Sequence, residues 1–524
     1  MKINLQKRRE VMERSIRLGH CICDPRRPCP CDVFREQDIC PCAGERPDPV
    51  DLAQVKLTRL VRNAGCASKI APSDLEAVLG RLPPVNDPAV ISGLAAADDA
   101  AIYRITENLY LVQTVDVFTP CVDDPHLFGR ICAANCLSDI YAMGGNPRTA
   151  LSVLAFPSET LDGEIMYHML AGAMETLDQA GVALVGGHSI KDDEIKLGFA
   201  ITGTIDPAVA AALEKPRSSD VLVLTKPLGT GVLAFCEQVG RGHPAGMAAA
   251  AASMATLNKA AAEAMKEAGA SACTDITGFG LFGHLMRMAR QSKLTAQICP
   301  TALPSFEGAL QALRDGVIPG AIERNREFVG SRLDITPGVD EALVHLGFDA
   351  QTSGGLLIAI PPERLERLQC ALTKRGAGVF IIGEFTSPSE GRIIVSEESV
   401  HAPIVMSNPS QPEPHQPGCC ADVFDAQPRG TTSVPETQKA FGAMMRSMQA
   451  PGALSEKAKE LILFGLVLYS RCPSCFDAHY YKTRELGITQ AELDEAAWCA
   501  IAMGGAPVRM FYQECLRRAQ AGKA

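Results

Sequence analysis

Seven prolines fall within residues 401–436, between a long N-terminal part of the chain and a short C-terminal part. They are Pro403, Pro409, Pro412, Pro414, Pro417, Pro428 and Pro435. Proline lacks the backbone N–H that helices and sheets use, and it blocks continuation of a helix. Neither a long helix nor a sheet can therefore run through this segment. We interpret residues 397–436 as a linker between a long N-terminal part and a short C-terminal part.

Length and composition limit the class of protein. The 524 residues carry a net charge of −10, whereas a dedicated nucleic-acid binder is usually basic, so we expect no nucleic-acid partner. The most apolar unbroken run, 461–469, is much shorter than the ~20 residues of a membrane-spanning helix. The charged N-terminus lacks the apolar stretch of a signal peptide. We therefore expect a globular cytoplasmic protein with no membrane partner, whose clustered cysteines bind metal or carry thiol chemistry.

Residues 55–396 alternate strand-like and helical patterns. Short apolar runs beside turn residues predict strands, and longer periodic stretches predict helices. The strand-like runs are Leu111–Val115, Val182–Val185, Val221–Leu224 and Leu356–Ile360, and the helical stretches include Ile131–Met143 and Met247–Ala268. This alternation is typical of an α/β or α+β fold. Pro207 and the polar stretch 215–220 divide it, so we expect one lobe over 55–210 and another over 215–396.

Acidic residues stand at the edges of several apolar runs. They are Asp98, Asp99, Asp116, Asp139 and Asp275. Carboxylates at strand ends and in loops can converge on one pocket, and hard oxygen ligands of this kind suit Mg²⁺, which usually bridges to substrate phosphates. Any one of them could instead be a helix cap or a turn former.

Glycine-rich turns accompany these carboxylates, and glycine allows backbone N–H groups to approach an anion closely. The turns are Gly144–Gly145, Gly186–Ser189, Gly229–Gly231 and Ser353–Gly355, and none matches a P-loop. Upstream, Cys66 stands three residues before Lys69. A nearby cation favours the thiolate, so Cys66 is a candidate reactive thiol, although many cysteines are buried and inert.

Taken in order, these segments resemble the selenophosphate synthetases, or selenide, water dikinases, over about residues 56–395. The strings Asp275–Gly280 and Gln351–Gly355 are specific within a superfamily that also holds aminoimidazole ribonucleotide synthetase and thiamine monophosphate kinase. The other matching strings are Gly65–Cys66, Lys69–Ile70, Asp98–Ala101, Phe128–Ile131, Ser138–Gly145, Gly186–Ser189 and Leu224–Gly229.

The resemblance implies a two-lobed α/β (α+β) core like that of aminoimidazole ribonucleotide synthetase, which forms a homodimer or higher homo-oligomer with ATP near the dimer interface. It implies that ATP, selenide and water become selenophosphate, AMP and phosphate. Asp99, Asp139 and Asp275 would hold Mg²⁺, and Cys66 would handle selenium with Lys69 at the phosphates. The implied ATP contacts are Lys69, Asp98, Asp116, Asp139, Gly187, His188 and Ser189.

Two departures from the family pattern affect local expectations. Many relatives have a second cysteine where Ser68 stands, so a Cys-x-Cys redox pair is not possible here. Ala96 and Ala97 replace a polar pair that often precedes Asp98. These changes concern local contacts and leave the expected metal ligands intact.

Residues 437–521 show helical periodicity almost throughout, punctuated by Gly487 and Gly504–Gly505, and predict a small all-α domain. Cys475 and His479 are four residues apart and share a helix face, where histidine can take a thiol proton, Glu460 can orient it and Cys472 can resolve the disulfide. Two inert core cysteines, or half a zinc site, are the alternatives. The spacing resembles the alkyl hydroperoxidase D-like branch of the carboxymuconolactone decarboxylase family, which implies oligomeric disulfide-reductase or peroxidase-type chemistry with a thiol electron donor.

Residues 1–50 form a cysteine-rich N-terminal extension. Its three Cys-x-Cys pairs are Cys21 with Cys23, Cys29 with Cys31, and Cys40 with Cys42. Such density favours an Fe–S cluster or another metal held by thiolates, and the Cys-Pro-Cys pieces faintly resemble the catalytic chain of ferredoxin-thioredoxin reductase, which carries a [4Fe–4S] cluster beside a redox disulfide. A thiol relay without a cluster and a disordered tail are the alternatives.

We therefore expect a selenophosphate synthetase with fused thiol modules that reduce or deliver selenium. One alternative is a thiol-disulfide oxidoreductase whose middle region binds nucleotide only as a regulator. Another is a related ATP-dependent kinase or synthetase that acts on a small metabolite.

Overall fold

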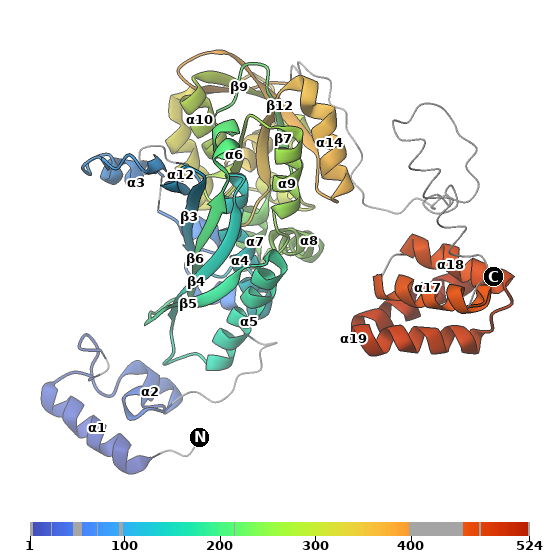
Figure 1. Ribbon diagram of the computed structural model, residues 1–524. Coiled ribbons are helices and arrows are strands. Elements are labelled where there is room, and N and C mark those ends of the chain that lie inside the picture. Colours follow the sequence, from blue (N-terminus) through green and yellow to red (C-terminus); the bar gives the residue numbers. More distant parts are fainter. Residues whose placement is uncertain are drawn as a thin grey trace. The chain divides into compact units, whose positions relative to one another are not determined.

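The computed structural model describes residues 4–22, 24–45, 55–70, 72–93, 98–213, 215–397, 454–470 and 473–521. The chain divides into two compact units, Met1–Met406 and Ser407–Ala524, and each is described by itself (Figure 1). In the described residues, no helix is long and apolar enough to cross a membrane.

A six-stranded sheet forms the first lobe, with the order β1-β2-β3-β6-β4-β5. Its neighbouring strands are antiparallel except for β4 and β5, which are parallel. The strands are β1 (Val90–Ser92), β2 (Ala101–Thr106), β3 (Leu109–Phe118), β4 (Asn146–Phe156), β5 (Ala183–Lys191) and β6 (Lys196–Ile205). The predicted strand Leu111–Val115 lies within β3, and the predicted strand Val182–Val185 overlaps the start of β5.

Two long helices, α4 (Pro125–Ala142) and α5 (Gly163–Ala180), pack against each other in this lobe. Their close approach depends on glycine, because a Cβ on Gly129 would lie 1.8 Å from the Met169 carbonyl oxygen. A Cβ on Gly172 would similarly lie 1.9 Å from the carbonyl oxygen of His126. Nearly all of α4 is buried, so the polar residues that it carries are placed in the interior.

A seven-stranded mixed sheet forms the second lobe, with the order β10-β13-β9-β12-β7-β11-β8. Its central strands β7 and β11 have the predicted bounds, and every residue in them is buried, as expected for uninterrupted apolar runs. The strands are β7 (Val221–Leu224), β8 (Ala272–Asp275), β9 (Leu294–Ile298), β10 (Leu333–Ile335), β11 (Leu356–Ile360), β12 (Phe380–Pro388) and β13 (Arg392–Val395).

Short helices surround this second sheet. They are α7 (Thr230–Gln238), α8 (Pro244–Met254), α9 (Lys259–Ala268), α10 (Gly280–Ser292), α11 (Ala309–Arg314), α12 (Gly320–Val329), α13 (Glu341–Phe348) and α14 (Leu365–Lys374). Two further helices lie elsewhere in the sequence: α3 (Pro72–Leu79) precedes the strands of both sheets, and α6 (Pro207–Ala212) lies between the two lobes. The prediction of one helix over Met247–Ala268 is wrong, because Asn258 interrupts it between α8 and α9. The Asn258 amide donates to Ser138 Oγ and to the Gly354 carbonyl, both at 2.8 Å, so a tertiary anchor replaces helix continuation.

The N-terminal extension contains α1 (Leu5–Leu18), α2 (Asp32–Gln37) and a 3₁₀ turn, Pro41–Ala43. A buried ion pair holds it together: Arg8 Nη2 lies 2.5 Å from Glu45 Oε2, and the Cys40 N–H donates to the same oxygen at 2.7 Å. Arg8 also lies over the Phe34 ring, 5.2 Å from its centroid. The described part of the extension is therefore folded, contrary to the disordered-tail alternative.

The second unit is helical where it is described, as predicted. It consists of α17 (Glu456–Ser470), α18 (Pro473–Glu485) and α19 (Gln490–Ala521) around a core that contains Phe464, Phe476 and Tyr512. Gly487, at φ 65°, follows the end of α18 as expected. Gly504–Gly505 was expected to interrupt the helix, but α19 continues through it.

Candidate functional site

Three carboxylates come from separate elements of the two-lobed core; Asp275 is buried, and Asp99 and Asp139 are partly buried. Asp99 precedes β2, Asp139 lies on α4, and Asp275 ends β8. Thr114 on β3 donates to Asp139 Oδ2 at 2.6 Å, and Thr274 donates to Asp99 Oδ1 at 2.9 Å. The second oxygen of Asp99 and both oxygens of Asp275 are buried without a hydrogen-bond partner in the described structure.

The electrostatics of these three carboxyl groups favour a bound cation. Burial, followed by repulsion from Asp275, raises the carboxyl pKa of both Asp99 and Asp139 well above the usual range. Burial also raises the pKa of Asp275. Oxygen donors with unsatisfied lone pairs are suitable ligands for Mg²⁺. Within the described ranges, however, no three acidic, histidine or cysteine side chains are already close enough to chelate a metal ion.

Lys69 and Asp116 form an ion pair beside this acidic group. Lys69 Nζ lies 2.7 Å from Asp116 Oδ1 and donates to Asp116 Oδ2 at 2.9 Å. Asn135 on α4 donates to the same Oδ2 at 2.5 Å, while its own Oδ1 accepts from the Ser353 N–H at 2.8 Å. Asn135 was not among the site residues predicted from the sequence, although its amide joins the ion pair to the loop at 351–355.

Cys66 begins a short 3₁₀ turn, Cys66–Ser68, and belongs to the same network. Its N–H donates to Thr352 Oγ1 at 3.1 Å, and its thiol donates to Asn135 Oδ1 at 3.6 Å. Burial raises the pKa of the Cys66 thiol to about 12, although the Lys69 charge acts in the opposite direction. Lys69 thus favours the thiolate as expected, but desolvation outweighs this attraction, so the net effect is a raised pKa.

The other expected ATP contacts lie outside this hydrogen-bonded network. Asp98 Oδ2 accepts from Ser92 Oγ at 3.0 Å, and its charge contributes to the raised pKa of Asp99. Residues Gly187–Ser189 lie on β5 at the edge of the first sheet, where they are exposed. A Cβ on Gly187 would lie 2.4 Å from the Ser152 carbonyl oxygen, so close pairing with β4 by itself explains this glycine.

The glycine turn before α7 binds side chains of the protein itself. Gln351 Oε1 accepts from the N–H groups of Gly229 and Thr230, and Asp349 Oδ2 accepts from those of Gly231 and Val232. These donors, which the sequence suggested as anion ligands, are therefore satisfied internally. The Gln351–Gly355 string thus braces α7, and it also supplies Thr352 and Ser353 to the Cys66 network.

A second group of thiol-associated residues lies in the helical unit. His479 Nδ1 and Glu460 Oε1 are 2.5 Å apart, and Lys482 Nζ lies 3.6 Å from Glu460 Oε2. Cys475 shares α18 with His479, four residues before it, and takes part in a disulfide bond. Cys472 lies outside the described residues. The expected pairing of glutamate and histidine is thus present, with Glu460 almost fully buried.

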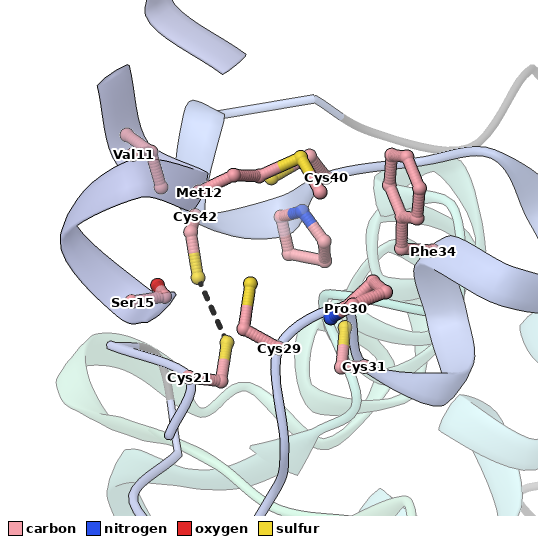
Figure 2. Close-up of a pocket in the computed structure, with 11 residues that line it drawn as sticks. Val11, Met12, Ser15, Cys21, Cys29, Pro30, Cys31, Phe34, Cys40 and Cys42 are labelled. Atoms are coloured by element: carbon pink, nitrogen blue, oxygen red, sulfur yellow. Dashed lines mark hydrogen bonds between the residues drawn. The ribbon is translucent and has the colours of Figure 1, made fainter. Parts of the chain in front are cut away.

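Five of the six N-terminal cysteines line one pocket, together with Met12 and Phe34 (Figure 2). Figure 2 shows the side chains of Cys21, Cys29 and Cys42 directed toward one another, and the Cys21 and Cys42 sulfurs are 3.2 Å apart. Cys42 is disulfide-bonded, whereas Cys29, Cys31 and Cys40 have free thiols. Cys23 lies outside the described residues.

Comparison with known proteins gives three family matches. Residues 97–205 and 217–396 match the N-terminal and C-terminal domains of the AIR synthase related proteins, and residues 435–512 match the carboxymuconolactone decarboxylase family. Among solved structures, a thiamine-monophosphate kinase from Stenotrophomonas maltophilia is similar over 64% of this chain and 98% of its own, with a TM-score of 0.44 and 18% identity.

Curated relatives are much closer in sequence. The selenide, water dikinase of Pelobacter propionicus is 43% identical over 342 residues, which cover 65% of this chain and 98% of the relative. That of Geobacter metallireducens is 43% identical over 343 residues, which cover 65% of this chain and 100% of the relative. With nearly the whole length of these relatives matched, the chain belongs to the selenide, water dikinase family, and it carries a carboxymuconolactone decarboxylase-family domain at its C-terminal end.

Proposed function

We propose that the two-lobed core converts ATP, selenide and water into selenophosphate, AMP and phosphate. The observation that carries this proposal is the set of buried carboxylate oxygens without partners on Asp99 and Asp275, next to the Lys69–Asp116 pair and the Cys66 thiol. A site that leaves anionic oxygens unsatisfied in its interior is built for cations and for the phosphates that accompany them. The names of the curated relatives supply the substrate class.

In this proposal Asp99, Asp139 and Asp275 hold Mg²⁺, which when bound neutralises charge on the ATP phosphates. Lys69 adds a further positive charge to the site. Its pairing with Asp116 fixes the position of the ammonium group before substrate arrives, and fixed charge is the main contribution that a protein makes to phosphoryl transfer. Asp98, Asp116 and the β5 segment 187–189 are the further proposed ATP contacts.

Cys66 handles selenium as a protonated thiol. Its raised pKa keeps it neutral at physiological pH, so it does not repel the hydrogenselenide anion as a thiolate would. Asn135 and Thr352 hold the residue through its thiol and its N–H. Burial of Cys66 also shields selenium bound there from oxidants in solution.

We propose further that the core forms a homodimer through the first sheet. Val115 on β3, Leu151 on β4 and Ile190 on β5 are exposed apolar side chains, each about half exposed or more. The strand register places Val115 and Leu151 opposite the same residue of β6, Ala200, so they share one face of the sheet. An apolar sheet face of this kind needs a covering surface, and a second copy would provide one.

Anaerobic ³¹P NMR of the full-length protein with ATP, Mg²⁺ and selenide tests the core activity. We expect selenophosphate, AMP and phosphate from the wild type, and no selenophosphate from Cys66→Ser. Cys370→Ser is the matched control, because Cys370 is an exposed thiol on α14, and it should match the wild type. Intact ATP with a folded protein that binds Mg-ATP would contradict the proposal and favour a redox protein with a regulatory nucleotide site.

The helical unit is proposed to carry thiol-disulfide chemistry that supplies reduced selenium to the core. The Glu460–His479 pair supports this, because a histidine oriented by a buried carboxylate can accept the proton of a thiol one turn away on the same helix. The double variant Cys472→Ser, Cys475→Ser should lower selenophosphate formation from oxidised selenium donors but not from free selenide. Unchanged rates with every donor would exclude the delivery role.

The N-terminal cysteines are proposed to bind an Fe–S cluster or another thiophilic metal. The support is the donor set: five cysteines line one pocket, and cysteine thiolates are the ligands that such centres use. Iron and sulfide analysis after anaerobic reconstitution tests it, with visible absorption as a second readout. We expect bound iron in the wild type and a loss in Cys29→Ser, whereas a protein that retains no metal would contradict the assignment.

A further inference from the structure

A second buried cysteine lies beside Cys66 in the folded core. Gly65 and Thr119 form an isolated antiparallel bridge, in which the Gly65 N–H donates to the Thr119 carbonyl at 3.1 Å. Thr119 Oγ1 also donates to the Asn63 carbonyl at 2.5 Å. These bonds join the segment that carries Cys66 to the segment that carries Cys121, two residues beyond the bridge.

The contact between these two segments is tight. A Cβ built on Gly65 would lie 3.0 Å from Cys121 Cβ and 2.4 Å from Thr352 Oγ1. Gly65 also has a φ of 60°, which side chains other than glycine rarely adopt. The residue immediately before Cys66 is therefore shaped so that Cys121 can approach it, and both thiols are only 1% exposed.

The two thiols also interact electrostatically. Burial is the main cause of the raised pKa of Cys121, and the charge of a Cys66 thiolate raises it further. Two other buried thiols nearby have different roles, because Cys132 and Cys136 on α4 each donate to a backbone carbonyl at 3.3 Å. Cys121 is therefore the nearby thiol best placed to react with an adduct on Cys66.

We propose that Cys66 and Cys121 form a buried dithiol that reduces thiol-bound selenium to selenide at the place where selenide is used. This inference rests on the proposed function, since it supplies the selenide that the core would consume. It places the second thiol in a different segment from Ser68, the position at which the sequence ruled out a Cys-x-Cys pair.

The chemistry proceeds in two balanced steps. A small-molecule selenopersulfide, R–S–Se⁻, transfers its selenium atom to the Cys66 thiol, which gives Cys66–S–Se⁻ and R–SH. The Cys121 thiol then attacks the Cys66 sulfur. A sulfur–sulfur bond forms, the sulfur–selenium bond breaks, and HSe⁻ leaves with the Cys121 proton. Selenium gains two electrons, which the two thiols lose as they become a disulfide.

A dithiol suits this task because both thiols are protonated until selenium arrives. The thiolate is the form that oxidants attack, so raised pKa values protect the pair from adventitious oxidation. A dithiol added from solution, of the class that reduces protein disulfides, then regenerates both thiols. In the absence of such a reductant, each chain can carry out this reduction once.

Peptide mapping tests the proposal directly. Trypsin places the two cysteines in separate peptides, 63–69 and 105–130, and each peptide contains no other cysteine. The fully reduced, full-length protein is treated anaerobically with one equivalent of glutathione selenopersulfide and digested without reductant. We expect mass spectrometry to find these two peptides joined by a disulfide. Selenated Cys66 without that disulfide would overturn the proposal.

Selenide release provides an independent readout. In a Cys472→Ser, Cys475→Ser background, with the selenopersulfide and no other reductant, the parent protein should release one selenide per chain, whereas Cys121→Ser and Cys121→Ala should release none and should keep selenium on Cys66. The control is Cys236→Ser, which removes an equally buried thiol from α7 and should resemble the parent protein. Equal yields from the Cys121 variants and the parent protein would overturn the dithiol.

The free-selenide reaction separates this proposal from the proposed function. The dithiol is not needed when selenide is supplied, so the Cys121 variants should then make selenophosphate at the wild-type rate. If the wild type makes none from free selenide, the proposed function fails, while the peptide map still reports whether the two thiols form a pair. A Cys121 variant that fails with free selenide as well would show a structural role and overturn the inference.

Discussion

The core and the helical unit place their cysteines in opposite surroundings. Cys66 is buried, and desolvation raises its pKa to about 12 even though Lys69 is near. Cys475 is partly exposed on α18, one turn from a histidine that a buried glutamate holds. Both are cysteines near a charged group, yet only Cys475 has a proton acceptor, His479, within one helical turn. Proximity of a cation in sequence therefore says less about a thiol than its burial does.

The two units also differ in how their buried carboxylates are paired. In the core, Asp99 and Asp275 carry buried carboxylate oxygens without hydrogen-bond partners in the described part of the chain, so the site is unfavourable until ligands arrive. In the helical unit the buried carboxylate, Glu460, contacts both His479 and Lys482. The core site can therefore gain binding energy from cations, whereas Glu460 already contacts two basic side chains.

Asp275→Asn should have the largest effect. It removes a proposed Mg²⁺ ligand, so selenophosphate formation should fall by at least about 10⁴-fold. Because burial raises the carboxyl pKa, ionisation above the unfolded-state pKa costs folding free energy, and stability falls as pH rises through the folded-state pKa. Near neutral pH, without Mg²⁺, the variant should therefore be more stable than the wild type by about 1 kcal/mol.

Denaturant unfolding with and without Mg²⁺, together with ³¹P NMR, measures both effects. Glu390→Gln is a suitable control, since Glu390 lies in the turn between β12 and β13, outside the site. An Asp275→Asn protein that is less stable than the wild type without Mg²⁺ would show that the carboxylate is already satisfied, and the contrast between the two units would fail.

The next largest effect should be a difference in alkylation rate between Cys66 and Cys475. A thiol with a pKa of about 12 has about a thousandfold less thiolate near pH 8 than an ordinary thiol with a pKa of about 8.5, so Cys66 should resist iodoacetamide. Its labelling rate should rise tenfold per pH unit up to pH 10. Reduced Cys475, which is partly exposed, should be labelled much faster at pH 8. Mass spectrometry of peptide 63–69 gives the Cys66 rate, and comparable rates for the two cysteines at pH 8 would refute the assigned environment.

Gly65→Ala should have the next largest effect and lower the free energy of unfolding by about 3 kcal/mol. The methyl group would require a positive φ and would overlap Thr352 Oγ1. Gly181→Ala separates the two causes, because Gly181 also has a positive φ, 74°, but nothing lies within 4 Å of its added Cβ. Gly181→Ala should cost only about 1 kcal/mol in urea unfolding. Equal losses for the two variants would show that Gly65 is required for its backbone conformation alone.

Much of the fold could be predicted from the sequence, because uninterrupted apolar runs leave few choices. The runs at 221–224 and 356–360 become the central buried strands with the predicted bounds. The predicted helix 247–268 failed because the side-chain bonds of Asn258 join segments far apart in the sequence, and periodicity contains no information about such partners.

The candidate site was predicted less completely for a related reason. Carboxylates at the edges of apolar runs can be recognised by residue type and position. Asp99, Asp139 and Asp275 were selected in this way. Asn135 looks like any polar residue of a helix, and Cys121 looks like any isolated cysteine. Their importance comes from what they contact across the fold, and the protonated state of Cys66 comes from burial, which local sequence does not specify.

Glu460→Gln should have the smallest effect and is the most specific test of the helical unit. Glutamine keeps a hydrogen-bond acceptor for His479 but removes the charge, so a bond to a charged group becomes a neutral one and loses about 1 kcal/mol. Thiol-disulfide exchange of the unit should slow by about fivefold, measured with a disulfide substrate of the full-length protein. Glu460→Ala, which removes the acceptor as well, should slow it further. Selenophosphate formation from free selenide should remain unchanged in both, because the core holds its own charges. If Glu460→Gln slowed that reaction too, the two units would not be chemically independent.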